Sequence, residues 1–324
     1  MRQGKELILA TKPYAKEVRW LSWYYTVSTL AILVALFAGT VWVPFLAGRI
    51  ACSIMAGLVL VRLFVIYHDH QHHSILTKSW LADAFFTAFG ILILVPTSIW
   101  KRTHDYHHAH NSRLYTASIG SFPIFTREKF LKCSRAQQIG YLAIRHPLTI
   151  LFGYLSVFLY GMTIQSFLSS PGKHWDSMIA VILHLAISVL IIIFFGWNVW
   201  LLSVCIPFSI ACAMGAYLFY AQHNFPGVTF KEDIEWSYDH AALESSSHME
   251  MNFFWKWVTA NIGYHHIHHI NSRIPFYRLP EVMAAIPELQ VAKKTSLNPS
   301  DIIACFRLKL WDPQRQQMIR LDQL

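Results

Sequence analysis

The sequence predicts an all-α integral membrane protein with four transmembrane helices in two hairpins, interfacial helices and a histidine-rich cytosolic cap. Its composition is 54% hydrophobic and 15% aromatic, and its mean hydropathy is +0.35. These values exceed those of ordinary soluble proteins. Several apolar stretches reach the roughly 18–20 residues that a spanning helix requires. Three histidine-rich segments lie just outside those stretches, and we expect all 324 residues to form one membrane-bound domain.

Six apolar stretches are candidates for spans: residues 25–48, 50–67, 81–100, 149–168, 178–196 and 197–221. They cannot all cross if the histidine clusters bind one metal centre, because the clusters must then lie on one side of the bilayer. A crossing at 81–100 would separate the first two clusters. Gly90 and Pro96 interrupt that segment, so we predict that it is re-entrant or interfacial.

An even number of crossings must then separate the second cluster from the third. We predict that 149–168 lies along the interface, because it follows Arg145, His146 and Pro147 and contains two glycines and a glutamine. Four spans remain, in two hairpins: 25–48 with 50–67, and 178–196 with 197–221.

The distribution of positive charge predicts the orientation. Arg49 is the one cation in the linkers inside the hairpins, whereas Lys and Arg crowd the N-terminal segment, residues 101–145 and the last hundred residues. By the positive-inside rule, the cap of residues 68–145 and 222–324 faces the cytosol. This rule explains the net charge of +9, although an acidic electron-donor protein or anionic lipid could also use it. We expect no nucleic-acid binding, since no basic helix stands apart from the membrane scaffold.

The histidine clusters read HDHQHH at 68–73, HDYHH at 104–108 and HHIHH at 265–269. Helical residues three and four apart share a face, so the histidines of each cluster can point one way. Neutral imidazole suits iron, zinc and copper, whereas magnesium and calcium prefer oxygen ligands. Eight imidazoles are too many for one ion, since a tetrahedral site takes four. The spacing therefore predicts two metal ions that share the set.

No electron-carrying motif accompanies these clusters. The five cysteines form no CxxC pair, and the sequence has no GxGxxG, P-loop or Cys-ligated iron–sulfur spacing. We therefore expect no disulfide or thiolate metal site, and we expect the electrons to come from another protein.

The order HxxxH(H), HxxHH, HxxHH, with one hairpin before the first box and another between the second and third, resembles the membrane-bound fatty acid desaturases. The segments YHDHQHHSIL, WKRTHDYHHAHN, FYAQHNFPG and NIGYHHIHHINSRIPFYRLP are similar to the acyl-lipid and phospholipid branch. The resemblance implies a di-iron centre that uses O2 and two electrons from an external ferredoxin or small haem protein to desaturate an acyl chain. It implies these metal ligands: His68, His72, His73, His104, His107, His108, His265, His268 and His269.

The first box departs from the family's frequent HDxGH, and helical spacing favours His72 over His73 as the partner of His68. We add His223 as a predicted ligand, because it follows the fourth span directly and emerges at the depth of the metals. The alternative is an interfacial histidine bonded to lipid phosphate or a backbone carbonyl. Other histidines are predicted to be solvent-facing or to hydrogen-bond around the ligands: His70, His110 and His266.

Several further residues have non-ligand interpretations. His184 lies mid-span, where a core histidine bonded to a neighbouring helix is expected. His146 and His174 are expected at the interface, and His240 and His248 are expected not to coordinate. Carboxylates beside the boxes, Asp69 and Asp105, can orient imidazoles or simply be solvated.

The favoured function is desaturation of an acyl chain, most simply one esterified in a lipid. A membrane di-iron hydroxylase or ketolase acting on an alkane, sterol or carotenoid is the alternative, and a non-catalytic metal or haem carrier is a third. Attack on an unactivated methylene requires that water be excluded, so we expect an apolar tunnel beneath the cap. Candidates for its walls are Trp100, Phe122, Phe125, Phe219 and Phe225. The alternative for each of them is an ordinary aromatic residue of the membrane interface.

Overall fold

The computed structural model describes residues 2–114, 121–232 and 234–324. Its first hairpin consists of α2, Arg19–Trp42, and α3, Leu46–Gln71. The predicted boundary at residues 48–50 was wrong, because the chain turns at Val43 to Phe45. Pro44 cannot continue a helix, whereas Gly48 is tolerated inside the first turns of α3. At its other end, α3 continues past the predicted residue 67 to Gln71 and includes the first histidines of the first box.

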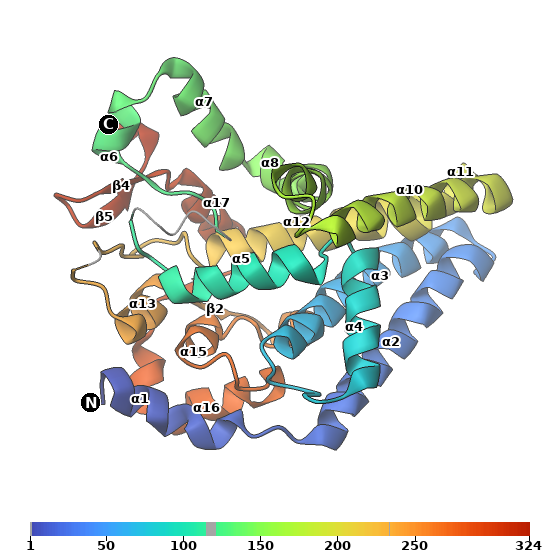
Figure 1. The fold of residues 1–324 in the computed structure, drawn as a ribbon, viewed down its shortest axis with the longest axis horizontal. Helices are drawn as coiled ribbons and strands as arrows, with labels where there is room; N and C mark the ends of the chain where they lie inside the picture. The colour runs from blue at the N-terminus through green and yellow to red at the C-terminus, as the bar shows by residue number, and fades with distance from the viewer. Residues whose placement is uncertain (1, 115–120, 233) are drawn as a thin grey trace.

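The second hairpin lies close to its predicted bounds. It comprises α10, Trp175–Phe195, then α11, Trp197–Trp200, the π-helical η3, Leu201–Cys205, and α12, Ile206–Ala221. Gly196 makes the turn with φ +85, a conformation that favours glycine. Within the described residues, four helices are long and apolar enough to cross a membrane, or five if the bent pair of residues 80–92 and 97–110 is taken as one span. They confirm the predicted all-α membrane architecture. Both hairpin turns lie at the right-hand end of Figure 1, away from the two termini.

The two returning helices, α3 and α12, pack against each other. Gly57 permits this approach, because a Cβ there would lie 2.8 Å from Ile210 Cβ and 2.9 Å from the Pro207 carbonyl oxygen. The ends of α3 and α12 that emerge from the hairpins therefore lie close together, where the histidines are.

The segment predicted to be re-entrant or interfacial is two helices, α4, Trp80–Leu92, and α5, Thr97–His110, bent by 94°. The break falls at Ile93 to Pro96, where Leu94 has φ +63. Gly90 does not interrupt α4, contrary to expectation. It allows a close approach, because a Cβ there would lie 2.8 Å from the Val95 carbonyl oxygen.

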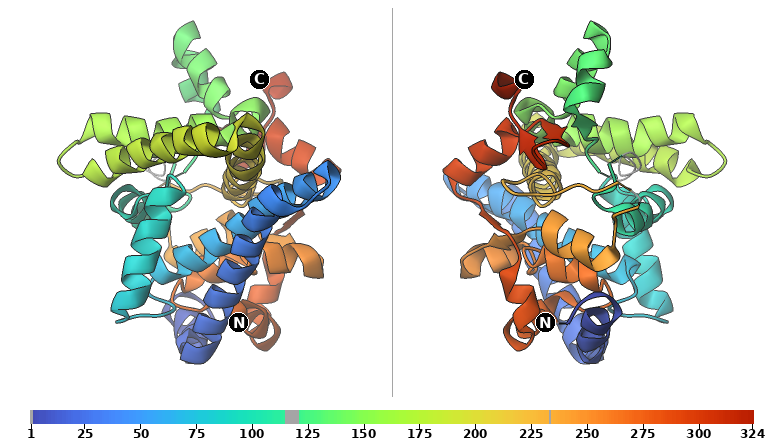
Figure 2. Two further views of the ribbon diagram at one scale, coloured as in Figure 1. Left: turned by 90° about the vertical axis from the view of Figure 1, so that its right-hand side faces the viewer. Right: turned by 90° about the vertical axis from the view of Figure 1, so that its left-hand side faces the viewer.

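Residues 147–169 form α8, Pro147–Leu151, the π-helical η2, Tyr154–Gln165, and α9, Ser166–Ser169. In Figure 1 the segment after α8 is seen nearly end-on, whereas α10 and α12 run across the view. It therefore crosses the direction of the hairpins, as an interfacial segment should. In Figure 2 this segment runs across the view while α12 is seen nearly end-on, and α7, Arg135–Ile144, projects beyond it.

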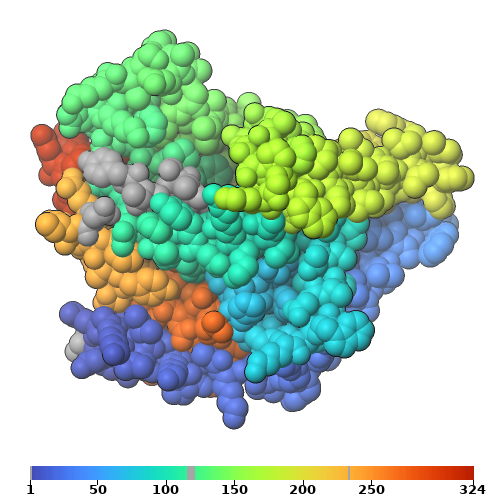
Figure 3. All heavy atoms as spheres, viewed as in Figure 1, coloured from blue at the N-terminus to red at the C-terminus, as the bar shows by residue number. Residues whose placement is uncertain are grey.

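Short elements form the cap at the end opposite the hairpin turns, where Figure 3 shows the N-terminal segment beside residues of the last hundred. Strand β1, Phe125–Thr126, pairs in parallel with β4, Leu310–Asp312, which pairs antiparallel with β5, Gln317–Ile319. Strand β2, His248–Glu250, pairs in parallel with β3, Lys294–Ser296. The remaining elements are α1 Gly4–Thr11, η1 Lys12–Ala15, α6 Arg127–Lys132, α13 Tyr238–Ser245, α14 Phe253–Val258, α15 His265–Ile270, η4 Phe276–Arg278, α16 Leu279–Ala285, η5 Pro287–Val291, α17 Pro299–Arg307 and η6 Leu321–Gln323.

Candidate metal centre

Nine of the ten predicted ligands come together in two adjacent groups. In each group one possible ligand atom per residue lies within 4.8 Å of all the others. The first group contains His68, His72, His104, His108 and His268, and the second contains His107, His223, His265 and His269. The groups touch, since the ring of His108 stacks on that of His269 with centroids 4.2 Å apart.

The first group joins the end of α3 to α5 and α15. Nε2 of His104 lies 2.9 Å from Nε2 of His68 and 3.2 Å from Nε2 of His108. Nε2 of His268 lies 3.1 Å from that of His108. The ring of His72 lies among these four, with centroids 4.6–4.9 Å away. Its Nε2 is buried and has no hydrogen-bond partner among the described residues.

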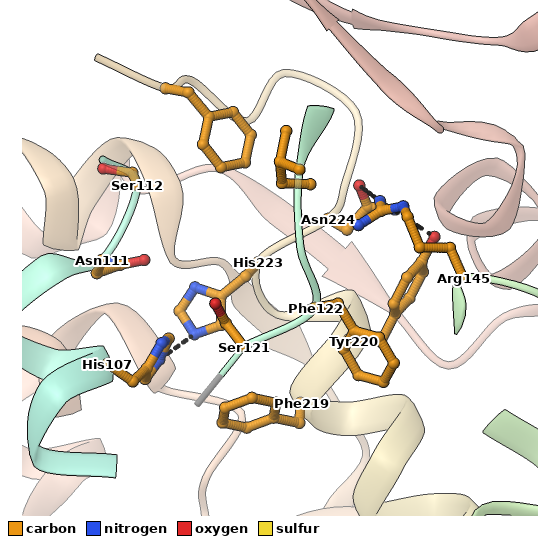
Figure 4. A pocket seen from close by; sticks show the side chains of 12 residues that line it. His107, Asn111, Ser112, Ser121, Phe122, Arg145, Phe219, Tyr220, His223 and Asn224 are labelled. Atoms are coloured by element: carbon orange, nitrogen blue, oxygen red, sulfur yellow. Dashed lines mark hydrogen bonds between the residues drawn. The ribbon is translucent and has the colours of Figure 1, made fainter. Parts of the chain in front are cut away.

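The second group joins the end of α12 to the same two helices, α5 and α15. Nε2 of His223 lies 3.0 Å from Nε2 of His107 and 2.9 Å from Nε2 of His265. Nε2 of His269 lies 3.1 Å from that of His265. Figure 4 shows His223, just after α12, and His107, on α5, directed toward each other. Each hairpin thus delivers one returning helix to one group.

The sequence interpretation that each box points one way is corrected here. In α5, His104 and His108 belong to the first group and His107 to the second; in α15, His265 and His269 belong to the second and His268 to the first. Residues four apart are nearly aligned on a helix, whereas consecutive residues diverge by about 100°. Adjacent histidines therefore face different groups.

Two hydrogen bonds orient the rings. Nδ1 of His223 lies 2.9 Å from the Ser245 carbonyl oxygen, which can only accept, so Nδ1 carries the proton and Nε2 keeps its lone pair. Nδ1 of His68 lies 3.2 Å from Oδ1 of Asp69. The orienting role considered for Asp69 therefore has a geometric basis. Sequence inspection missed Ser245, because a backbone carbonyl leaves no residue-type signal.

Burial favours the neutral imidazoles that metal ions bind. Desolvation lowers the pKa of His223 to about 4, and desolvation together with neighbouring histidines lowers the pKa of His265, His268 and His269 well below the usual value. The spacing also fits a metal. Around an ion with metal–nitrogen bonds of about 2.1 Å, adjacent octahedral ligand atoms are about 3 Å apart. The donor set therefore suits two transition-metal ions and offers no oxygen cage for calcium or magnesium.

His73 is not brought into either group. It follows the end of α3 with φ +55, and its side chain is exposed. The helix therefore stops before His73 could turn toward the metals. Of the histidines placed off the shared faces, His70 and His266 are buried rather than solvent-facing. Nε2 of His70 lies 3.1 Å from Oδ1 of Asp83, and Nε2 of His266 donates to the Leu289 carbonyl oxygen at 3.1 Å.

The remaining histidines lie away from both groups. The prediction for His184 is confirmed, because its Nε2 hydrogen-bonds to the hydroxyl of Tyr154 on η2. His110 stacks on Tyr106. Asp105 forms an ion pair with Lys101, with half of its side chain exposed, and the structure gives it no imidazole to orient. The others that the groups exclude are His146, His174, His240 and His248.

Two adjoining cavities lie among the helices of the hairpins, and a separate cavity lies beside the second histidine group. The largest of the three, about 570 Å³, lies between the two hairpins and is lined mainly by apolar residues of α2, α3, α4, α10 and η3, together with His184, Ser188 and Ser203. A cavity of about 30 Å³ shares Leu60, Ile93 and Phe208 with it and extends to Phe64 and Gly215. The ring of Phe64 meets that of Trp100 at 5.1 Å, and Trp100 stacks on His104 at 4.7 Å.

The third cavity, about 20 Å³, reaches the second group directly and is lined by His107, His223, Phe122 and Phe219 among others (Figure 4). Of the predicted tunnel walls, Trp100, Phe122 and Phe219 thus lie beside the histidines. Phe125 instead stacks on Tyr141, and Phe225 is fully buried; neither lines these cavities.

Comparison with known proteins identifies the family to which the chain belongs. The family model for fatty acid desaturases matches residues 42–299. The chain belongs to the fatty acid desaturase family. A fatty acid desaturase of Bacillus subtilis (strain 168) is 29% identical over 83% of this chain and 76% of that protein. The sn-1 oleoyl-lipid 12-desaturase of Synechocystis sp. (strain ATCC 27184 / PCC 6803 / Kazusa) is 24% identical over 80% and 73%, respectively.

The sn-1 acyl-lipid omega-3 desaturase (ferredoxin) of Nostoc sp. (strain 36) is 24% identical over 72% of this chain and 66% of that protein. These matches confirm the resemblance on which the sequence interpretation rested, and they show an oxidoreductase of the desaturase type. The family contains acyl-lipid desaturases, and this member combines histidine boxes with apolar helices.

Proposed function

We propose that this fatty acid desaturase introduces a double bond into a lipid-linked acyl chain, using O2, two iron ions and an external electron donor. The observation that carries the proposal is the pair of adjacent histidine groups, one at the end of each hairpin. Two irons would activate O2, which is the oxidant that removes two hydrogens from the unactivated acyl chain and, with two electrons and two protons, is reduced to water. The nine histidines would hold them, five on one ion and four on the other, with His68 oriented by Asp69 and His223 by Ser245.

The cavities support an acyl substrate. The space of about 570 Å³ lies between helices that would face the bilayer core, so a lipid acyl chain can enter it without crossing water. The second cavity continues toward Trp100 and His104 along apolar side chains. These walls would exclude water from the reacting carbons and hold the chain beside the irons. A lipid-linked substrate fits this entrance because its headgroup can stay at the membrane surface.

The proposal also covers the orientation of the protein in the membrane and its electron donor. We place the cap of residues 68–145 and 222–324 in the cytosol, in one membrane-bound domain, because Lys and Arg concentrate there. We place the electron donor on this side as well. A relative whose name includes ferredoxin supports a small iron–sulfur protein as donor, and a small haem protein is the other candidate.

Lipid analysis tests the proposal. The chain is expressed in a bacterial host with the donor and its reductase, and the esterified acyl chains are compared with those from cells that express His268→Ala. A new unsaturated acyl chain in intact membrane lipid supports desaturation, whereas a hydroxylated or keto product would support the alternative oxygenase. Identical lipids with wild-type and variant protein, despite loaded iron and a reduced donor, would overturn the enzymatic proposal.

A further inference from the structure

Four polar side chains join the start of α5 to the start of α10, outside both histidine groups. Oδ2 of Asp176 accepts a 3.1 Å hydrogen bond from the backbone N–H of Ser98, and Oδ1 of Asp176 lies 2.5 Å from Oγ of Ser98. Oγ of Ser98 lies 2.9 Å from Nδ1 of His174. Nε2 of His174 lies 3.2 Å from Nη1 of Arg102, and His174 is 3% exposed.

The hydrogen bonds of this cluster all donate in one direction along the chain of four side chains. The carboxylate of Asp176 can only accept, so the single hydroxyl proton of Ser98 is donated to it. Oγ of Ser98 must therefore accept from Nδ1–H of His174. That leaves Nε2 of His174 unprotonated, and it accepts from Arg102, whose guanidinium can only donate. The chain runs from Arg102 through His174 and Ser98 to Asp176 without a competing arrangement.

The cluster supplies a helix cap that α5 cannot make for itself. The first N–H groups of a helix have no partner within it, and a side-chain oxygen just before the helix usually accepts one of them. The residue in that position is Pro96, whose ring has no oxygen. Asp176, in the first turn of α10, takes over this role across the helix interface and places a negative charge at the positive end of α5.

The position of α5 matters because this helix serves both metal groups. His104 lies six residues beyond Ser98, about 9 Å along the helix. A slide or rotation of α5 would therefore move ligands of both irons relative to the acyl chain. The hydrogen bonds of Asp176 fix α5 to α10, which is one of the helices that line the cavity between the hairpins.

We propose that Asp176 is a positioning residue for the reaction, which holds α5 against α10 and thereby determines which carbons of the acyl chain lie at the irons. The inference rests on the proposed function. It predicts that the helix cap made by Asp176 affects the position of the new double bond in addition to the rate. A cap that only stabilised the fold would leave that position unchanged.

The test compares Asp176→Ala and Asp176→Asn with Asp105→Asn, which removes an exposed carboxylate from α5 itself without touching the cap. We expect Asp176→Ala to lower turnover per bound iron about 10- to 100-fold, since small displacements of reacting groups have effects of this size. We also expect a mixture of double-bond positions from it. Asp176→Asn keeps an oxygen that can accept from Ser98 N–H and should lie between wild type and Asp176→Ala.

Two measurements separate positioning from folding and from the proposed function. Hydrogen exchange at the amide of Ser98 should accelerate in Asp176→Ala, and iron retained after dialysis against a chelator should fall, whether or not a product is detected. Unchanged exchange and iron would overturn the cap itself. A lower yield of protein with the wild-type double-bond position and turnover per iron would overturn the positioning role. Absence of product from wild type would overturn the proposed function while leaving the cap to be decided by exchange and iron.

Discussion

Asp69 connects His68 of the first histidine group to Phe276 in the segment after the third box. Its Oδ1 lies 3.2 Å from Nδ1 of His68, and its Oδ2 accepts a 2.7 Å hydrogen bond from the backbone N–H of Phe276. The side chain of Asp69 is 2% exposed. A buried carboxylate that accepts from Nδ1 leaves Nε2 free to bind metal and increases its basicity. The same side chain thus orients a ligand and holds the cap onto α3.

The first prediction concerns this carboxylate. Asp69→Asn should weaken iron binding in the first group about 10- to 100-fold, the usual effect of losing such a partner. Iron per chain is measured by mass spectrometry across a series of chelator concentrations. Asp83→Asn is the matched control, because its carboxylate pairs with His70 and its side chain is 63% exposed. Equal iron affinity in the two variants would show that Asp69 does not support the metal.

The second prediction assigns one ligand to each group. His268→Ala and His107→Ala should each abolish desaturation and reduce bound iron from two per chain toward one. The neighbouring His266→Ala should keep both irons, although loss of its hydrogen bond to Leu289 should destabilise the fold by about 1–3 kcal/mol. Product formation by His268→Ala or His107→Ala would remove that residue from the ligand set.

The third prediction tests His223, which lies outside the three boxes. His223→Ala should lower iron content and activity together, since its Nε2 lies 2.9–3.0 Å from two other imidazole nitrogens. Gln222 is unsuitable as a control, because its side chain donates to the Ile262 carbonyl oxygen just before the third box. The exposed His146 is a better one, and His146→Ala should resemble wild type. Full iron occupancy in His223→Ala would assign His223 to hydrogen bonding alone.

The fourth prediction examines the apolar route to the irons. A Cβ at Gly215 would meet Phe158 at 3.7 Å, so the first carbon of a larger side chain fits and the rest would fill the small cavity. Gly215→Leu should therefore reduce turnover of long acyl chains more than that of short ones, with iron content unchanged. Gly140→Leu, where nothing lies within 4 Å, is the control. Identical chain-length profiles would place the acyl chain elsewhere.

The fifth prediction concerns the electron supply. Purified protein should be inactive with NADH or NADPH alone and active when ferredoxin, or a small haem protein, is added with its reductase. If the donor docks on the basic cap, activity should fall as ionic strength rises above about 0.1 M, where charges are screened beyond about 10 Å. The reductase without the donor is the control. Turnover on a nicotinamide nucleotide alone would contradict the need for a donor.

The sequence alone was sufficient for the features that depend on local pattern. Apolar length indicated six candidate spans, and the requirement that the histidine clusters share one side of the bilayer reduced them to four. The spacing of histidines predicted a shared metal centre, and the position of His223 after the fourth span predicted its place beside them. Pro44, which precedes α3 at the first turn, is visible in the sequence, but the predicted boundary was placed at residues 48–50 instead.

Tertiary packing decided how the ligands are divided. Helical spacing shows that His107 and His108 diverge, but which group each one meets depends on where the ends of α3 and α12 lie around α5. Tertiary structure also decides the fate of His73, which lies outside both groups. Helix α3 ends at Gln71, and His73 adopts a left-handed conformation that directs it away from the metals. The cap that Asp176 provides for α5 joins residues 78 positions apart. Such contacts follow from packing between distant segments, and no local pattern in the chain encodes them.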